Sequence, residues 1–289
     1  MPGPIVGRVV LGQRLEAHRN ARNLSALDAA RAIGDRTDIR VRHYEAGRRV
    51  PKYETVALLG QRYGLTEEQV ADLQAMREVA AARNHWARYQ LPETASTYMG
   101  MEEDAIELRT VEHVTVPGIL QTEAYTRRKL ELGGLAPVDV GKRVTARLQR
   151  QKRLATDDES PLALFAVISE AALRRCAAEA EVGWLQLEHL KSLGQRPNVE
   201  VRVLPLDIGL HAGMDGGFSV LHFEEGVLQD IAYVENVMGG HLNDEAPTVA
   251  ALEMLFGKLR SQALDPNDSL DWIIQLAEQT RKTQRGSRI

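Results

Sequence analysis

The sequence predicts a mostly helical α+β fold, in which a bundle of five short helices is followed by a larger domain that mixes helices and strands. Apolar residues recur three or four positions apart through about the first eighty residues, which is typical of amphipathic helices. Beyond that point, helical patterns alternate with short β-branched and aromatic runs that favour strands. The chain has 289 residues, 44% of them hydrophobic, which is enough for two domains with separate cores. We place the first domain at residues 1–83, a linker at 84–98 and the second domain at 99–289.

The first two helices follow from apolar spacing and from end signals. A first helix is expected over residues 8–21, with Leu11 on its inner face and Arg19 in an outward row of arginines. Ser25 can begin a second helix, because its hydroxyl can accept a hydrogen bond from a backbone N–H of the first turn. Gly34 ends that helix, since glycine readily adopts the left-handed conformation found at helix ends.

The third helix is short and has two different sides. Thr37 or Asp38 can cap it, and Val41 and Tyr44 turn inward because they are three residues apart. Glu45 lies near its C-terminal end, where the helix dipole disfavours a carboxylate, so we expect it to pair with an arginine. The residues left facing outward, or lying near the start of the helix, are Arg36, Thr37, Ile39, Arg40, Arg42 and His43. Two further helices complete the bundle. Their inward residues are Val56, Leu59 and Tyr63 in one, and Val70, Leu73 and Met76, after a start at Thr66, in the other.

The second domain is predicted to be a modest sheet surrounded by helices. The stretch Gln90–Thr94 has the composition of a joint between domains. Strands are expected at Glu112–Val116, Leu162–Ile168, Val199–Leu204, Phe218–Phe223 and Ile231–Val234. Helices are expected over residues 119–131, 138–154, 170–177, 180–194, 247–262 and 268–281.

Charge is distributed unequally along the chain. Residues 1–66 carry 12 Lys and Arg against 6 Asp and Glu, a net charge of +6, whereas the remainder carries 24 against 34, a net charge of −10. A basic end on an acidic body fits a protein that binds a polyanion through one end, although chance clustering of solvated arginines would give the same totals. The single cysteine, Cys176, excludes an intramolecular disulfide framework and fits a reducing compartment. We recognise neither a signal sequence nor a membrane-spanning run, so we expect a cytoplasmic protein with no membrane partner.

The second predicted helix, the turn at Gly34, the short third helix and the basic residues that follow it together have the geometry of a DNA-reading helix-turn-helix. The segment resembles the Cro/C1-type helix-turn-helix family, also called the xenobiotic-response-element (XRE) family. The motifs that carry the resemblance are Leu11–Leu15 (LGQRL), Leu24–Gly34 and Tyr44–Pro51 (YEAGRRVP). Two features depart from the family pattern. Ala26 stands where a glutamine that contacts the DNA backbone is common, and the turn Asp35–Asp38 is longer than usual and acidic. The resemblance implies a sequence-specific DNA-binding transcriptional regulator.

From Trp86 to about Arg281, the chain resembles the C-terminal domain of the antitoxin-like transcriptional regulators. The motifs that carry this resemblance are Val116–Tyr125 (VPGILQTEAY), Glu170–Arg175 (EAALRR), Pro197–Val199 with Val203–Pro205, and Tyr233–Glu235. The resemblance implies a bacterial repressor or activator that often works beside a small protein encoded nearby. We therefore expect the C-terminal domain to mediate homodimerisation and control by such a neighbouring-gene protein.

The expected DNA contacts fall into two groups. Arg40, Arg42 and His43 are candidates for base or groove contact, because arginine can donate two hydrogen bonds to guanine O6 and N7 in the major groove. Ile39 could touch a thymine methyl group. The flanking candidates, expected mainly at phosphates, are Arg36, Thr37, Arg48, Arg49 and Lys52. For the three flanking arginines, the alternative is a solvated loop. Double-stranded DNA would be bound by a homodimer, since a dimer spaces two such helices about one DNA turn apart.

The second domain offers weaker candidate sites. Glycines in the loop His211–Phe218 would permit close approach of a ligand, although a plain turn before a strand explains the same residues. An acidic cleft would form if the ends of three strands converged, at His222, Glu224, Glu225, Glu170 and Glu235. We find no phosphate-binding loop, dinucleotide-binding motif, nucleophile elbow or tight metal-ligand motif, so we expect no enzyme activity, no cofactor and no metal. The alternative function is a ligand-sensing regulator whose C-terminal domain binds a small-molecule effector.

Overall fold

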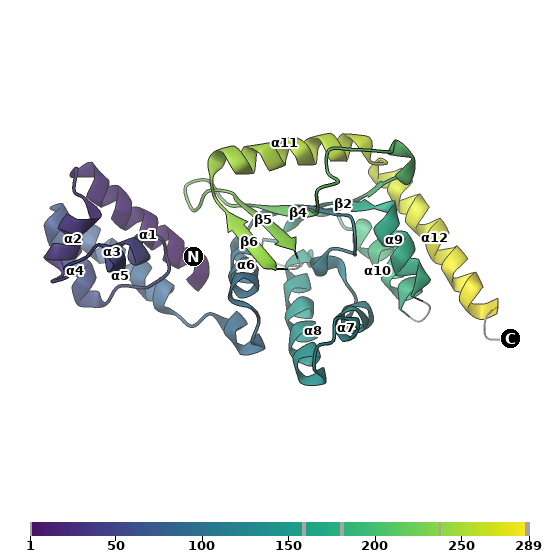
Figure 1. Cartoon of the computed structure of the whole chain (residues 1–289), viewed down its shortest axis with the longest axis horizontal. Coiled ribbons are helices and arrows are strands. Elements are labelled where there is room, and N and C mark those ends of the chain that lie inside the picture. Colours follow the sequence, from purple (N-terminus) through teal and green to yellow (C-terminus); the bar gives the residue numbers. More distant parts are fainter. Residues whose placement is uncertain (1, 158–159, 180–181, 237, 287–289) are drawn as a thin grey trace. The chain divides into compact units, whose positions relative to one another are not determined.

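The computed structural model describes residues 2–157, 160–179, 182–236 and 238–286 (Figure 1). The chain divides into two compact units. The first comprises the residues up to His85 together with the short segment Glu225–Leu228, and the second comprises the rest of the chain from Trp86 onward. Helices predominate, and a sheet lies in the second unit, so the predicted α+β class is confirmed.

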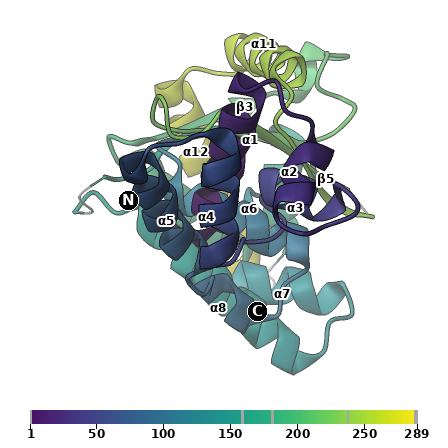
Figure 2. The ribbon, with the colours of Figure 1, turned by 90° about the vertical axis from the view of Figure 1, so that its left-hand side faces the viewer.

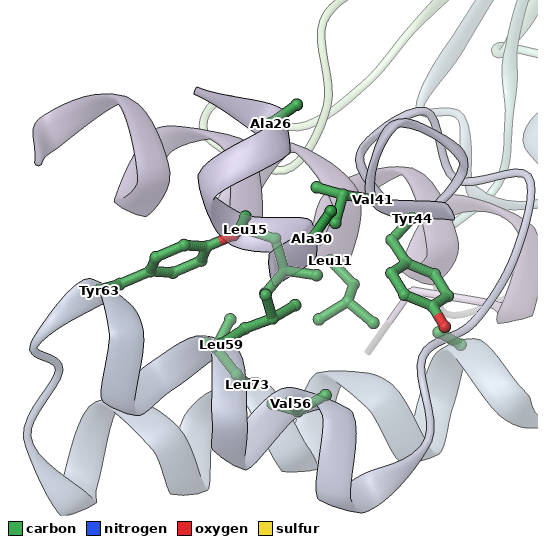
Figure 3. Close-up of a cluster of buried hydrophobic side chains, with 12 residues drawn as sticks. Leu11, Leu15, Ala26, Ala30, Val41, Tyr44, Val56, Leu59, Tyr63 and Leu73 are labelled. Carbon is green, nitrogen blue, oxygen red and sulfur yellow. The ribbon is translucent and has the colours of Figure 1, made fainter. Parts of the chain in front are cut away.

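The first unit is the predicted five-helix bundle. Its helices are α1 (Pro4–Ala21), α2 (Ala26–Ala32), α3 (Ile39–Glu45), α4 (Tyr53–Tyr63) and α5 (Glu67–Ala81). Their inward side chains form one buried core (Figure 3). Members of this core from three helices are Leu11, Leu15, Val41, Tyr44 and Leu59. Val41 and Tyr44 point inward as predicted, and this orientation leaves the opposite side of α3 outside the core.

Side-chain caps explain where two of these helices begin. The Ser25 hydroxyl accepts a hydrogen bond from the Asp28 backbone N–H at 3.1 Å, and the Ser25 N–H donates to the Asp28 carboxylate at 3.0 Å. Thr66 and Gln69 form the same reciprocal arrangement at the start of α5. Gly34 follows α2 with a φ of +81°, in the left-handed region that favours glycine. The end signals predicted at Ser25, Gly34 and Thr66 are therefore confirmed.

Helix α1 passes close to the C-terminal end of α3. A Cβ on Gly12 would lie 2.3 Å from the Glu45 carbonyl oxygen, so the missing side chain permits the approach. Arg19, predicted to face outward, is instead buried, with 8% of its surface exposed. Its guanidinium donates to the Glu45 carboxylate at 2.6 and 3.0 Å and to the Leu24 carbonyl oxygen at 2.8 Å. The prediction for Arg19 is wrong because its partner is 26 residues away, beyond the reach of helical periodicity.

The segment expected as a linker, residues 84–98, contains regular structure. A 3-10 helix, η1 (His85–Tyr89), is followed by α6 (Glu93–Asp104). Trp86 and Tyr89 are buried, and the Trp86 indole N–H donates to the Glu103 carboxylate at 3.2 Å. The second unit thus begins earlier than residue 99, because these aromatic side chains belong to its core.

Within the described residues, a six-stranded sheet forms the centre of the second unit, in the order β3-β2-β1-β4-β5-β6. The strands are β1 (Glu107–Glu112), β2 (Ala163–Ser169), β3 (Val199–Leu204), β4 (Phe218–His222), β5 (Ile231–Asn236) and β6 (Gly239–Asn243). The first three are mutually parallel, whereas β4 is antiparallel to both β1 and β5, and β6 is antiparallel to β5. Strands β1 and β5 therefore run in the same direction, and their carboxyl ends lie at the same edge of the sheet.

Helices cover both faces of this sheet. They are α7 (Glu123–Leu132), α8 (Pro137–Gln151), α9 (Glu170–Ala178), α10 (Gly183–Gly194), α11 (Ala246–Gln262) and α12 (Pro266–Gly286), with short 3-10 turns η2 (Gly118–Leu120), η3 (Lys152–Leu154) and η4 (Leu206–Ile208). Helix α11 packs on one face, where Phe256 and Leu259 join Val111 and Val220 in a buried cluster. Helices α6, α7 and α8 lie on the opposite side (Figure 1). Each of the six predicted helical stretches corresponds to a helix, and α6 was not predicted.

The first strand lies earlier than predicted. Instead of Glu112–Val116, it covers Glu107–Glu112, and the residues after it form a loop. The charged residues Glu107 and Arg109 made this strand hard to recognise. They face α11, where the Arg109 guanidinium contacts the carboxylates of Glu107 and Glu253. Strand β6 was also not predicted, because it is short and begins with two glycines.

Candidate nucleic-acid interface

Helix α3 and the turn before it form the candidate DNA-reading surface. Helices α2 and α3 lie side by side (Figures 1 and 2), connected by residues 33–38. Because Val41 and Tyr44 are buried, the opposite side of α3 faces outward. Ile39 is 57% exposed, although an isoleucine would usually be buried. An exposed apolar residue next to arginines can contact base methyl groups and base edges.

The predicted DNA-contacting residues come from three consecutive segments: the turn before α3, α3 itself and the connection to α4. Those that are exposed are Arg36, Thr37, Ile39, Arg40, Arg42, Arg48, Arg49 and Lys52. His43 is partly buried. Their contacts with DNA stay predictions.

Acidic residues of the turn hold two of these arginines. The Arg40 Nε donates to the Asp35 carboxylate at 2.5 Å, and a second contact joins Arg40 Nη2 to the same carboxylate. The Arg42 Nε donates to Asp38 at 2.6 Å. Asp38 occupies the N-cap position of α3 but makes no capping hydrogen bond, because its carboxylate is engaged by Arg42. Sequence reasoning found acidic residues near the reading surface but not these pairings.

Glu45 pairs with an arginine, as predicted. Its partner is Arg19, and the two side chains are 8% and 10% exposed. The hydrogen bond to Glu45 raises the pKa of Arg19, although burial opposes it. Arg22, the residue that follows α1, donates to the Tyr63 carbonyl oxygen at 2.7 Å at the end of α4. Helix α3 is thus fixed to α1 by a buried ion pair, which keeps its outward face in place.

The loop before β4 shows the contacts of a local turn. The rings of His211 and His113 lie 5.4 Å apart between centroids, and the Gly213 N–H donates to His211 Nδ1 at 3.2 Å. Burial, followed by the proximity of His211, lowers the pKa of His113 and favours its neutral form. Asp215 is exposed. These contacts favour the plain-turn interpretation of this loop.

The acidic cleft expected from strand ends does not form. Because β4 is antiparallel to β1 and β5, His222 and the two glutamates after it lie at the opposite edge of the sheet from Glu170 and Glu235. Glu170 is also engaged, accepting from Arg174 Nε at 2.6 Å and from the Leu206 N–H at 3.0 Å. Burial acts to raise the pKa of Glu170, but these hydrogen bonds lower it overall. The prediction was wrong because strand direction cannot be read from strand-end residues alone.

His222 belongs to a charged network under α11. Its Nδ1 lies 2.8 Å from the Asp230 carboxylate and its Nε2 lies 3.0 Å from the Glu253 carboxylate. Glu253 also contacts Arg109, and the Arg109 guanidinium lies over the Phe256 ring. This network ties the sheet to α11.

The described residues contain no group of three or more His, Cys, Asp and Glu side chains placed to hold a metal ion. Within the same part of the chain, no helix has both the length and the apolar character needed to cross a membrane.

The five-helix bundle, with cations on the outward side of α3, has the helix-turn-helix arrangement found in DNA-binding transcription regulators. Residues 10–73 match a helix-turn-helix domain, which agrees with the predicted DNA-binding end. Residues 95–275, more than half of the chain, match a domain of unknown function (DUF5753), and the protein belongs to this family. No curated protein and no solved structure matches the chain. The antitoxin-like resemblance of the second half stays a prediction.

Proposed function

We propose that the protein is a non-enzymatic regulator that reads its operator as a homodimer, with α3 in the major groove. The observation that carries this is the outward face of α3, where Ile39, Arg40 and Arg42 are exposed on a helix fixed from behind by a buried core. Seven residues of helix span roughly 10 Å, or about three base pairs, too few to specify one site. A dimer with half-sites about 34 Å apart supplies the missing specificity.

The two arginines of α3 are not equivalent. Asp35 holds both Nε and Nη2 of Arg40, whereas Asp38 holds Arg42 at Nε. Among the described residues, the two terminal amino groups of Arg42 have no hydrogen-bond partner. A guanine is read by two donors of one guanidinium. Arg42 can supply both without breaking its pair, so it is the stronger candidate for base reading.

A mobility-shift assay on the DNA upstream of the protein's own gene tests this assignment. Arg42→Ala should weaken specific binding by roughly ten- to hundredfold, and the double variant with Arg40→Ala should abolish the specific shift. Arg127→Ala is the matched control, because Arg127 is exposed and also held by a carboxylate four residues away, but lies on α7. Unchanged binding by the double variant would refute the assignment of α3.

The flanking cations are proposed to contact phosphates. Replacing Arg48 and Lys52 together should weaken binding to specific and random DNA alike. It should also reduce the slope of log affinity against log salt concentration by about two, roughly one for each lost contact. A loss confined to the specific sequence would instead assign these residues to base reading.

We further propose that the second unit provides the dimer contacts and responds to a small protein from a neighbouring gene. The resemblance of its motifs to antitoxin-like regulators supports this. A pull-down with the full chain and that neighbouring protein tests it, and the mass of the complex in solution tests the dimer. A non-catalytic role is supported by the ion pairs that occupy His222 and Glu170. Sensing of a small molecule is the second candidate. It is favoured by Glu112 and Arg147 of the second unit, which are partly buried and make no ion pair with any described residue.

A further inference from the structure

Two carboxylates flank a glycine at the carboxyl edge of the sheet. Thr110, Ser219 and Tyr233 stand side by side across β1, β4 and β5, and their side chains share one face. Glu112 and Glu235 lie two residues further along β1 and β5. Gly217, the residue before β4, lies between them. A Cβ on Gly217 would lie 2.7 Å from the Val111 carbonyl oxygen and 3.4 Å from a Glu112 carboxylate oxygen. Glycine therefore leaves space where a side chain would separate the two acids.

Two cations approach the same place from α7 and α8. Arg147 lies over Gly118, since a Cβ there would be 2.2 Å from Arg147 Nη1. Lys129 is exposed and donates to the Thr115 hydroxyl at 3.3 Å. Both cations interact electrostatically with Glu112 and Glu235. We call Glu112, Lys129, Arg147 and Glu235 the mixed-charge cluster.

The inner members of this cluster are partly buried and yet unpaired. Within the described part of the chain, neither Glu112 nor Arg147 has a hydrogen-bond partner or an opposite charge within ion-pair distance. Burial raises the pKa of Glu112 to about 7. Burial, assisted by the neighbouring Arg150, lowers the pKa of Arg147 to about 10. In both groups burial outweighs the attraction of the opposite charges nearby, so the lost hydration of the charged form is only partly compensated.

The next arginine along α8 shows how this fold satisfies a buried charge. Arg150 donates to the Glu102 carboxylate at 2.7 and 2.6 Å, and both side chains are almost fully buried. Arg147 is one helical turn away from Arg150 on the same side of α8. Paired and unpaired charges therefore stand next to each other. Unpaired charges at the carboxyl ends of strands β1 and β5 are placed as in many ligand sites of open sheets.

We propose that the mixed-charge cluster binds a small zwitterion of the α-amino acid type, with its carboxylate on Arg147 and Lys129 and its ammonium on Glu112 and Glu235. A zwitterion matches the charges of the cluster, which has two positive and two negative side chains close enough to interact electrostatically. Because Arg147 and Glu112 are not bonded to each other, the guanidinium can donate to the carboxylate of such a ligand, and the glutamate carboxylate can accept from its ammonium. The proposal names the ligand class for the ligand-sensing candidate, and it requires neither DNA binding nor partner control.

The test is thermal unfolding of the full chain without DNA, in the presence of each of the common α-amino acids. At least one should raise the Tm by a few degrees, with a shift that grows logarithmically with concentration. The amide of that amino acid lacks the carboxylate, and its N-acetyl form lacks the ammonium. Both should lose the shift. If no amino acid raises the Tm, or if both blocked forms work equally well, the proposal is overturned.

Variants assign the effect to the cluster. Arg147→Gln and Glu112→Gln should each weaken amino-acid binding at least tenfold by calorimetry, whereas the exposed control Arg127→Gln should not. The Tm of each variant without ligand shows whether Glu112 serves ligand binding or the stability of the fold. Without ligand at about pH 8, Glu112→Gln should maintain or raise the Tm because it removes an unpaired charge, while Glu102→Gln should lower it by weakening the pair with Arg150. If Glu112→Gln lowers the Tm as much as Glu102→Gln does, Glu112 is structural and the proposal fails.

Discussion

Replacing Glu45 with alanine should destabilise the first unit without altering the second. Glu45 accepts two charge-assisted hydrogen bonds from Arg19, at 2.6 and 3.0 Å, and both side chains are largely buried. Removing one partner of a buried pair typically costs 3–5 kcal/mol. Arg19 would still reach the Leu24 carbonyl oxygen and lies 3.5 Å from the exposed Glu16, so we expect the lower end, about 3 kcal/mol. Glu45→Gln, which retains one acceptor, should cost less.

The assay can separate the units because their chromophores differ. All the tryptophans, Trp86, Trp184 and Trp272, belong to the second unit. Urea unfolding followed by tryptophan fluorescence therefore reports the second unit, while far-ultraviolet circular dichroism also reports the helices of the first. Glu45→Ala should move an early dichroism transition to lower urea and leave the fluorescence transition in place.

A double-mutant cycle tests whether the pair itself is responsible. Arg19→Met should also be destabilising, because it leaves Glu45 without its cation. The combination Arg19→Met with Glu45→Ala should cost far less than the sum of the two single variants, with a coupling of about 2 kcal/mol or more. Additive effects, or a loss below about 1 kcal/mol for Glu45→Ala, would refute the argument that this pair fixes α3.

Three further outcomes follow from contacts in both units. Gly12→Ala should destabilise the first unit by about 1–3 kcal/mol in the same dichroism assay, because its Cβ would lie 2.3 Å from a backbone oxygen of α3. An unchanged stability would contradict the close approach of α1 to α3. Burial opposes the charged form of His222, but the hydrogen bond to Glu253 and the charge of Asp230 raise its pKa overall. Its stabilising contribution is therefore complete below its ordinary pKa of 6.5 and is lost as the pH rises through the raised pKa. Between these two values, the stability measured by fluorescence should fall more steeply in the native protein than in His222→Gln. Cys176 is buried and its pKa is raised to about 12, so it should react with a thiol reagent only after denaturation, and rapid reaction in the native protein would show that the thiol is accessible.

Sequence reasoning succeeded where structure follows from local pattern. The helix expected over residues 247–262 is α11, Ala246–Gln262, because its apolar residues repeat at helical spacing along its whole length. Ser25 and Gly34 likewise marked the ends of α2, since capping and left-handed turns depend on neighbouring residues. The inward direction of Val41 followed from the same periodicity.

Failures occurred where a partner lies far along the chain. Arg19 looked like a surface residue until Glu45 was brought beside it. Strand β1 was missed because Arg109 resembles a loop residue, and its partner Glu253 comes 144 residues later. The mixed-charge cluster gave no local signal either, since its members come from two strands and two helices. In each case, burial of a charge depends on tertiary contacts that periodicity does not encode.

The acidic turn before α3 illustrates the same principle at the DNA-reading surface. In the sequence, Asp35 and Asp38 place negative charge next to the surface expected to contact DNA. In the structure, each carboxylate is neutralised by an arginine, so the turn presents cations in defined positions and little net repulsion. Because both pairs are exposed, each holds its arginine weakly and competes only modestly with a DNA contact. Residues that looked like an obstacle to DNA binding therefore serve to orient the side chains proposed to read it.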